Sequence, residues 1–224
     1  MNALKKKQER WKEAKKVDLN KRYTPQTWPD HPETATLEGK NKFVGFWLLL
    51  AAETVTFASL FATYLALKDK GPSGMEFSAA GLFELPLVFA MTMLLLTSSL
   101  TSVYAMYHMK NHNFKAMQAW LGITVLLGLA FLGLEIYEFN HYVHIGFGYT
   151  NSAFSSAFFT LVGTHGAHVV FGLSWFIALM LRNAKRGLNM YNAPKFYLAA
   201  LYWHFIDVVW VFIFTVVYLM GVIG

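Results

Sequence analysis

Residues 201–221 read LYWHFIDVVWVFIFTVVYLMG, and this stretch decides the fold. It is long enough to cross the hydrocarbon core of a bilayer, which takes about 20 apolar residues. His204 and Asp207 stand three residues apart within it, so a helix places both on one face. Ionisable side chains at membrane depth are costly and normally point into a helix bundle. The stretch therefore predicts a transmembrane helix whose polar face is covered by other helices.

The composition of the 224-residue chain is that of a membrane protein. Hydrophobic residues make up 55% and charged residues 14%, against about 25% charged residues in soluble domains. The chain has no cysteine, which excludes disulfides, thiolate-bound zinc, iron–sulfur clusters and copper centres that need a cysteine ligand. The first apolar run begins near Phe43 and is too long for a signal peptide, whose apolar region has roughly 7–15 residues. We expect that run to remain as a membrane span.

Five apolar runs follow one another along the chain, and each is longer than the roughly 20 residues that a transmembrane helix needs. They cover residues 43–67, 86–109, 117–139, 153–181 and 196–221. The sequence therefore predicts an all-α fold, a polytopic membrane helix bundle with five transmembrane helices over residues 43–224, after a basic cytoplasmic tail at 1–42. Small residues in the third run, at Gly122, Gly128 and Gly133, predict close contacts between helices.

The distribution of positive charge predicts the orientation in the membrane. Five crossings place the two termini on opposite sides. Of the 19 Lys and Arg residues, 11 lie in the tail, 2 in the second loop and 4 in the fourth loop, all on the side of the N-terminus. The other side carries only Lys68 and Lys70. The positive-inside rule then places the N-terminus in the cytoplasm and the C-terminus outside, and it explains the basic pI without a nucleic-acid partner.

Glu53 lies close to the midplane of the first span, about 15 Å along a helix that rises about 1.5 Å per residue. Because the interiors of the spans hold no Lys or Arg to pair with it, burial favours its neutral form. We therefore expect Glu53 to be a proton-linked or lipid-contacting residue. The other ionisable residues of the spans come in pairs spaced three apart and predict a structural polar layer joining several helices: Glu135, Glu138, His165, His168, His204 and Asp207, with Trp210.

Metal binding by His165 and His168 is the less favoured interpretation. Ligands of a haem or a di-iron site must converge from several helices, and the middle of the spans holds only three histidines. We therefore predict no catalytic, cofactor-binding or metal-binding residue in this chain.

Four segments carry a resemblance to a known family. GFWLLLAAETVTFASLFATY (45–64), FLGLEIYEF (131–139), LVGTHGAHVVFG (161–172) and the stretch at 201–221 resemble subunit III of the haem–copper oxidases in its short, five-helix bacterial form. The likeness covers nearly all of residues 43–221. The sequence is most similar to that subunit of a cytochrome c oxidase of the caa3 or aa3 type, and the related quinol oxidases have very similar spans.

This resemblance implies a non-catalytic subunit of a proton-pumping terminal respiratory oxidase in the bacterial plasma membrane. It implies that haem and copper belong to partner subunits, that the chain packs directly on subunit I, and that subunit II, a small subunit IV and phospholipid are further partners. The subunit is expected to support assembly and sustained proton uptake. The carbodiimide-reactive glutamate of the family corresponds to Glu53, the HGxHV motif to residues 165–169, and YWHFxDVVW to residues 202–210. Two helices of the seven-helix form are missing, and helices of a partner subunit are expected in their place.

Three alternatives remain open from the residues. Subunit III of a quinol oxidase shares the same motifs. A proton-coupled transporter would also place acidic groups at the midplane, but it would usually show repeats or broken helices. A membrane di-metal enzyme would need His-rich clusters near the cytoplasmic face, where the chain has His31, His108 and His112.

Overall fold

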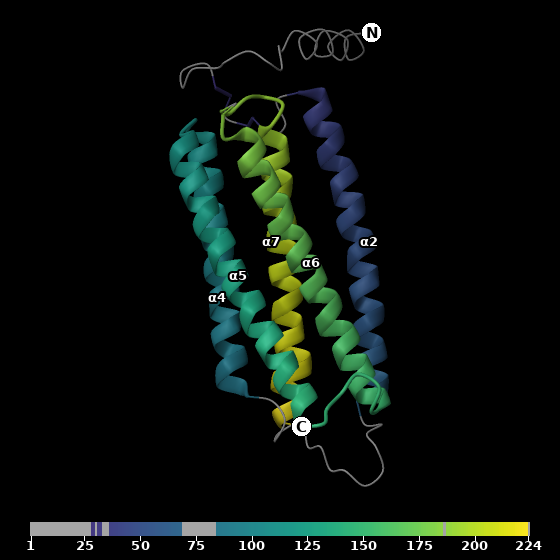
Figure 1. The fold of residues 1–224 in the computed structure, drawn as a ribbon. Coiled ribbons are helices and arrows are strands. Elements are labelled where there is room, and N and C mark those ends of the chain that lie inside the picture. The colour runs from purple at the N-terminus through teal and green to yellow at the C-terminus, as the bar shows by residue number, and fades with distance from the viewer. Residues whose placement is uncertain (1–27, 30, 33–35, 69–83, 186, 224) are drawn as a thin grey trace, which may run out of the picture.

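The computed structural model describes residues 28–29, 31–32, 36–68, 84–185 and 187–223, and these residues form a bundle of long helices (Figure 1). Five helices are long and apolar enough to cross a membrane, which confirms the predicted all-α membrane fold. The fifth span continues from α7 through a π-helix, η1, into the short α8. The elements are α2 (Leu37–Leu67), α4 (Leu85–Lys110), α5 (Phe114–His144), α6 (Ala153–Asn183), α7 (Ala193–Ile213), η1 (Phe214–Leu219) and α8 (Met220–Ile223).

Several helices extend beyond the predicted spans, and polar side chains cap the first turns of α2 and α6. α2 begins at Leu37 rather than at residue 43, and the Thr36 hydroxyl accepts the backbone N–H of Gly39 at 3.0 Å. α6 begins with a reciprocal cap between Ser152 and Ser155. The predicted boundary of the cytoplasmic tail therefore falls inside α2, and most of that tail lies outside the described residues.

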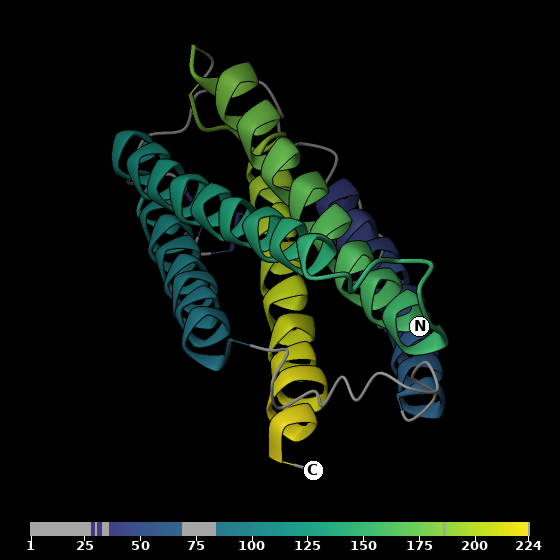
Figure 2. The ribbon, with the colours of Figure 1, turned by 60° about the horizontal axis from the view of Figure 1, so that its bottom comes forward.

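α7 lies in the middle of the bundle. Figures 1 and 2 show α4 and α5 on one side of α7 and α6 with α2 on the other, and α7 contacts α2, α4 and α6. α4 and α5 pack side by side, joined by a short turn in which His112 adopts a positive φ of 54°. Burial lowers the pKa of His112, which lies outside the spans, so its neutral form is favoured in this turn.

Trp203 holds three helices together at the centre. Its ring is 1% exposed and lies between Gly128 of α5 and Gly172 of α6. A Cβ atom on Gly128 would lie 2.7 Å from Leu173 Cδ2 and 2.8 Å from Trp203 Cη2. The predicted close contact is therefore found at Gly128, whereas a Cβ on Gly133 would meet no atom within 4 Å.

α2 is the least buried of the five helices. Only 17% of its most apolar segment is buried, against 33–39% in the other four. Its large apolar side chains, such as Leu48 at 69% and Val55 at 70% exposure, face outward. This helix therefore leaves most of its surface available to lipid or to another protein.

The close packing of Trp203 against Gly128 can be tested by substitution. Gly128→Ala should lower the free energy of unfolding by about 1–3 kcal/mol, because the added methyl overpacks the ring and Leu173. The measurement is the midpoint of SDS-induced unfolding of the purified protein. Gly133→Ala is the matched control and should leave that midpoint unchanged or raise it slightly. Equal effects of the two substitutions would contradict the close contact between Gly128 and Trp203.

Candidate functional site

Glu53 and His168 form a polar contact between α2 and α6. Glu53 Oε2 lies 3.2 Å from His168 Nε2, and the side chains are 26% and 21% exposed on the outside of the bundle. Phe57 packs edge-on against the imidazole, with ring centroids 5.1 Å apart. The two residues are 115 positions apart in the sequence, and α2 and α6 bring them together at mid-bundle.

The hydrogen bonds of His168 determine how many protons this contact holds. His168 Nδ1 lies 2.7 Å from the Thr164 carbonyl oxygen. A carbonyl can only accept, so Nδ1 carries a hydrogen. The Nε2···Oε2 contact then holds one proton, either on a neutral Glu53 carboxyl or on an imidazolium paired with a carboxylate. Both arrangements have zero net charge, which suits a partly lipid-exposed position.

His204 and Asp207 contact α4. His204 Nδ1 lies 2.5 Å from the Ser99 hydroxyl. Asp207 is 6% exposed, and its Oδ1 has no hydrogen-bond partner among the described residues. Covering this polar face with another helix is what the sequence predicted. Ser99, however, was not assigned as the partner, because a Ser in a helix can equally bond to its own preceding carbonyls.

His165 and Trp210 form the buried centre of the site. The His165 ring is fully buried and lies 5.1 Å from the Trp210 ring, and its Nε2 lies 3.3 Å from the Ile206 carbonyl oxygen. Trp210 Nε1 donates to Thr92 Oγ1 of α4 at 3.0 Å. These contacts are structural hydrogen bonds and ring packing between α4, α6 and α7.

Glu135 and Glu138 lie toward the C-terminal end of α5 and are 3% and 2% exposed. Tyr142 donates to Glu138 Oε1 at 2.6 Å, and Tyr218 of η1 donates to Oε2 at 3.1 Å. Glu135 lies against Gly166, where a Cβ would come within 2.8 Å of Oε1. Sequence reasoning did not identify Tyr142 and Tyr218 as partners. The spacing of Glu138 and Tyr142, four residues apart on one helix, was the available signal.

The predicted polar residues therefore contact several separate sets of partners, and the Glu53–His168 contact is partly exposed on the outside of the bundle. His165 and His168 point to different partners. Within the part of the chain that the structure describes, no three His, Asp or Glu side chains are grouped so that they could hold a metal ion.

Comparison with known proteins identifies the family. A family model described as cytochrome c oxidase subunit III matches residues 27–222. The chain belongs to this family. Cytochrome c oxidase subunit 3 of Bacillus sp. strain PS3 is 73% identical over 209 residues, which are 93% of this chain and 100% of the relative. Cytochrome c oxidase subunit 3 of Bacillus subtilis strain 168 is 66% identical with the same coverage.

A relative named probable quinol oxidase subunit 3, from Staphylococcus saprophyticus, is 51% identical over 83% of this chain and 92% of its own length. Membership of the subunit III family confirms the resemblance of the four sequence motifs. It makes the chain a multi-pass membrane protein that associates with other subunits of a haem–copper oxidase.

The hydrogen bond from Tyr218 to Glu138 can be tested with one isosteric change. Tyr218→Phe removes a buried hydrogen bond and should lower the free energy of unfolding by about 0.6 kcal/mol, the average for such bonds inside membranes, and at most about 1.7 kcal/mol. SDS-induced unfolding measures it. Tyr137→Phe, on a side chain 60% exposed on the same helix as Glu138, should have no effect. The assignment fails if both changes are silent.

Proposed function

We propose that this chain is the non-catalytic subunit III of a proton-pumping cytochrome c oxidase in a bacterial plasma membrane. The observation that carries this proposal is the 73% identity over 93% of the chain to a relative named cytochrome c oxidase subunit 3. Haem and copper then belong to partner subunits, and this chain holds no redox centre. The chemistry of its polar residues suits this role, since their described contacts are hydrogen bonds and ring packing.

Cytochrome c is the proposed electron donor of the complex. The relatives named cytochrome c oxidase subunit 3 are 66–73% identical to this chain, and those named probable quinol oxidase subunit 3 are 48–51% identical. A quinol oxidase is the alternative that these identities favour less. Copper in excess of the haem–copper centre, together with turnover on reduced cytochrome c, supports the first donor.

Glu53 and His168 are the residues proposed to support proton uptake. Their contact holds one proton and is partly exposed, so the proton can be exchanged without opening the bundle core. The exposed surface of α2 beside it is proposed to contact phospholipid. The chain is proposed to pack directly on subunit I, and helices of a partner subunit are proposed to fill the place of the two helices that the seven-helix form carries. Subunit II and a small subunit IV complete the proposed complex.

The Glu53 carboxyl is the residue to change first. Glu53→Gln keeps the size of the side chain and an N–H donor for His168, so the complex should assemble and turn over normally at first. Glu53→Ala loses the donor to His168, so it should show normal initial oxygen consumption followed by faster loss of activity during turnover. Oxygen-electrode traces of the purified complexes measure both rates. Decay of both variants at the wild-type rate would remove Glu53 from proton uptake.

The proposed orientation places the N-terminus in the cytoplasm. Every described Lys and Arg except Lys68 lies at the end of the bundle where α2 and α7 begin and where α4 and α6 end (Figure 1). These residues are Lys40, Lys42, Lys110, Lys115, Arg182, Lys185 and Lys195. A basic end of this kind is retained on the cytoplasmic side.

This orientation predicts the result of limited proteolysis. Trypsin added to sealed, right-side-out vesicles should leave the Lys and Arg residues before Phe43 uncut, and disrupting the vesicles with detergent should expose them. The measurement is the mass of the protected N-terminal fragment. Cleavage within residues 5–22 in sealed vesicles would reverse the orientation.

Purification in mild detergent tests the function as a whole. Recovery of this chain with larger subunits that carry haem a supports the proposal. Recovery of a lone chain with transport activity supports a proton-coupled transporter, and a lone chain with tightly bound metal supports a di-metal enzyme. Either of the last two results contradicts the proposal.

A further inference from the structure

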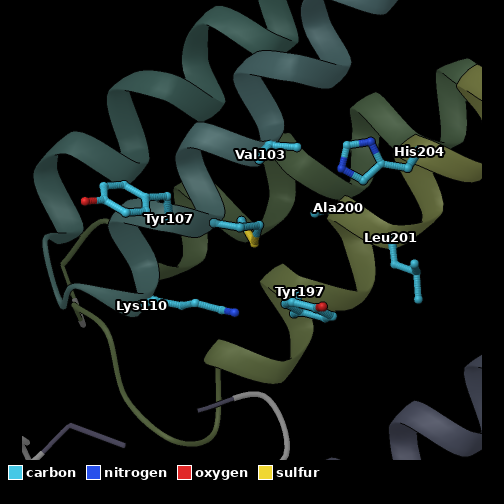
Figure 3. Close-up of a pocket in the computed structure, with 8 residues that line it drawn as sticks. Val103, Tyr107, Lys110, Tyr197, Ala200, Leu201 and His204 are labelled. Carbon is cyan, nitrogen blue, oxygen red and sulfur yellow. The ribbon is translucent and has the colours of Figure 1, made fainter. Parts of the chain in front are cut away.

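A groove of about 310 Å³ lies between α4 and α7, at the basic end of the bundle (Figure 3). Met106 and Ala200, at 8% and 3% exposure, form its floor. The more exposed Val103 and Leu201 form its apolar walls. This groove is separate from the Glu53–His168 contact, which joins α2 and α6.

The outer end of the groove is positively charged. Lys110 is the last residue of α4, and its side chain extends toward Tyr197 of α7 (Figure 3). Among the residues that the structure describes, Lys110 makes no ion pair with an acidic side chain. A lysine at the end of a transmembrane helix lies at headgroup level, where basic pockets between helices bind anionic lipid headgroups.

The inner end of the groove is formed by His204. Ser99 occupies its Nδ1, so Nε2 is the ring nitrogen that remains for the groove. His204 lies two helical turns beyond Tyr197, which is about 10 Å along α7. A transmembrane helix is about 30 Å long and would extend far past this groove. The dimensions fit the upper part of a single acyl chain.

We propose that this groove binds one anionic phospholipid, with its phosphate at Lys110 and Tyr197 and the first part of an acyl chain between Val103 and Leu201. Charge complementarity at Lys110 selects an anionic headgroup, and the apolar walls between Lys110 and His204 hold the chain. The site lies at the proposed cytoplasmic face and goes beyond the role of Glu53. It ties the ends of α4 and α7 to the lipid that surrounds them.

Photolabelling of the assembled oxidase tests the proposal. The complex is reconstituted in phosphatidylcholine vesicles with phosphatidylglycerol that carries a photoreactive group on one acyl chain, and the labelled peptides are identified by mass spectrometry. Peptides containing residues 103–110 and 197–204 should be labelled. Lys110→Gln should reduce this labelling about fivefold, the loss expected for one lysine at the membrane surface. Lys115→Gln, at the same end of the bundle, should leave it unchanged.

A second pair of variants tests the acyl-chain part of the groove. Val103 and Val170 are both 50% exposed, but Val170 lies on α6 and does not line the groove. Val103→Phe should reduce labelling of the groove peptides as much as Lys110→Gln does, and Val170→Phe should not. Photoreactive phosphatidylcholine should label the groove peptides of the wild type no more strongly than photoreactive phosphatidylglycerol labels those of Lys110→Gln.

Three results overturn the proposal. Equal labelling by both lipids shows general contact with the bilayer. Equal labelling of all variants shows that neither Lys110 nor the groove selects the lipid. Unlabelled groove peptides in a complete complex show that a partner subunit covers the groove. Co-isolation of the haem-carrying subunits is scored in the same samples, so failure of the oxidase assignment is seen separately.

Discussion

The fold depends on one constraint, which is that polar groups inside the hydrocarbon core must find partners within the protein. α7 carries several such groups, and three of them reach α4. Trp203 Nε1 donates to Ser98 Oγ at 3.0 Å, Trp210 Nε1 donates to Thr92 Oγ1 at 3.0 Å, and His204 contacts Ser99. These bonds fix both the rotation and the depth of α7 against α4, because any slip leaves indole N–H groups unpaired in a core without water.

The position of the Glu53–His168 contact follows from the placement of α7. Trp203 lies between Gly128 and Gly172, so α5 and α6 approach the same ring from two sides. With α6 held in this way, His168 faces outward and meets Glu53 on α2. α2 has the least buried surface of the five helices. The buried interior therefore places the Glu53–His168 contact at a partly exposed surface, and this position is the basis of the role proposed for it.

Much of the fold could be predicted from the sequence because apolar length and helical spacing are local properties. The five spans were confirmed, and the spacing of His204 and Asp207 indicated a covered polar face. Partners could not be predicted, since spacing tells which residues share a face but not which helix lies opposite. Ser98 shows the difficulty, because it donates to the Leu95 carbonyl of its own helix while its oxygen also accepts from Trp203 of α7. The π-helical turn that carries Tyr218 to Glu138 has no comparable local signal.

A double-mutant cycle between Trp210 and Thr92 tests most directly whether the bonds from α7 to α4 hold the bundle together. The free energy of unfolding in SDS is measured for the wild type, Trp210→Phe, Thr92→Val and the double variant. The cycle cancels the bond that Thr92 makes to its own helix and isolates the contact between the two side chains. We predict a coupling energy of about 0.6 kcal/mol, the average that double-mutant cycles give for hydrogen bonds between helices in membranes, and at most about 1.7 kcal/mol. Simple additivity of the two single changes would contradict the account.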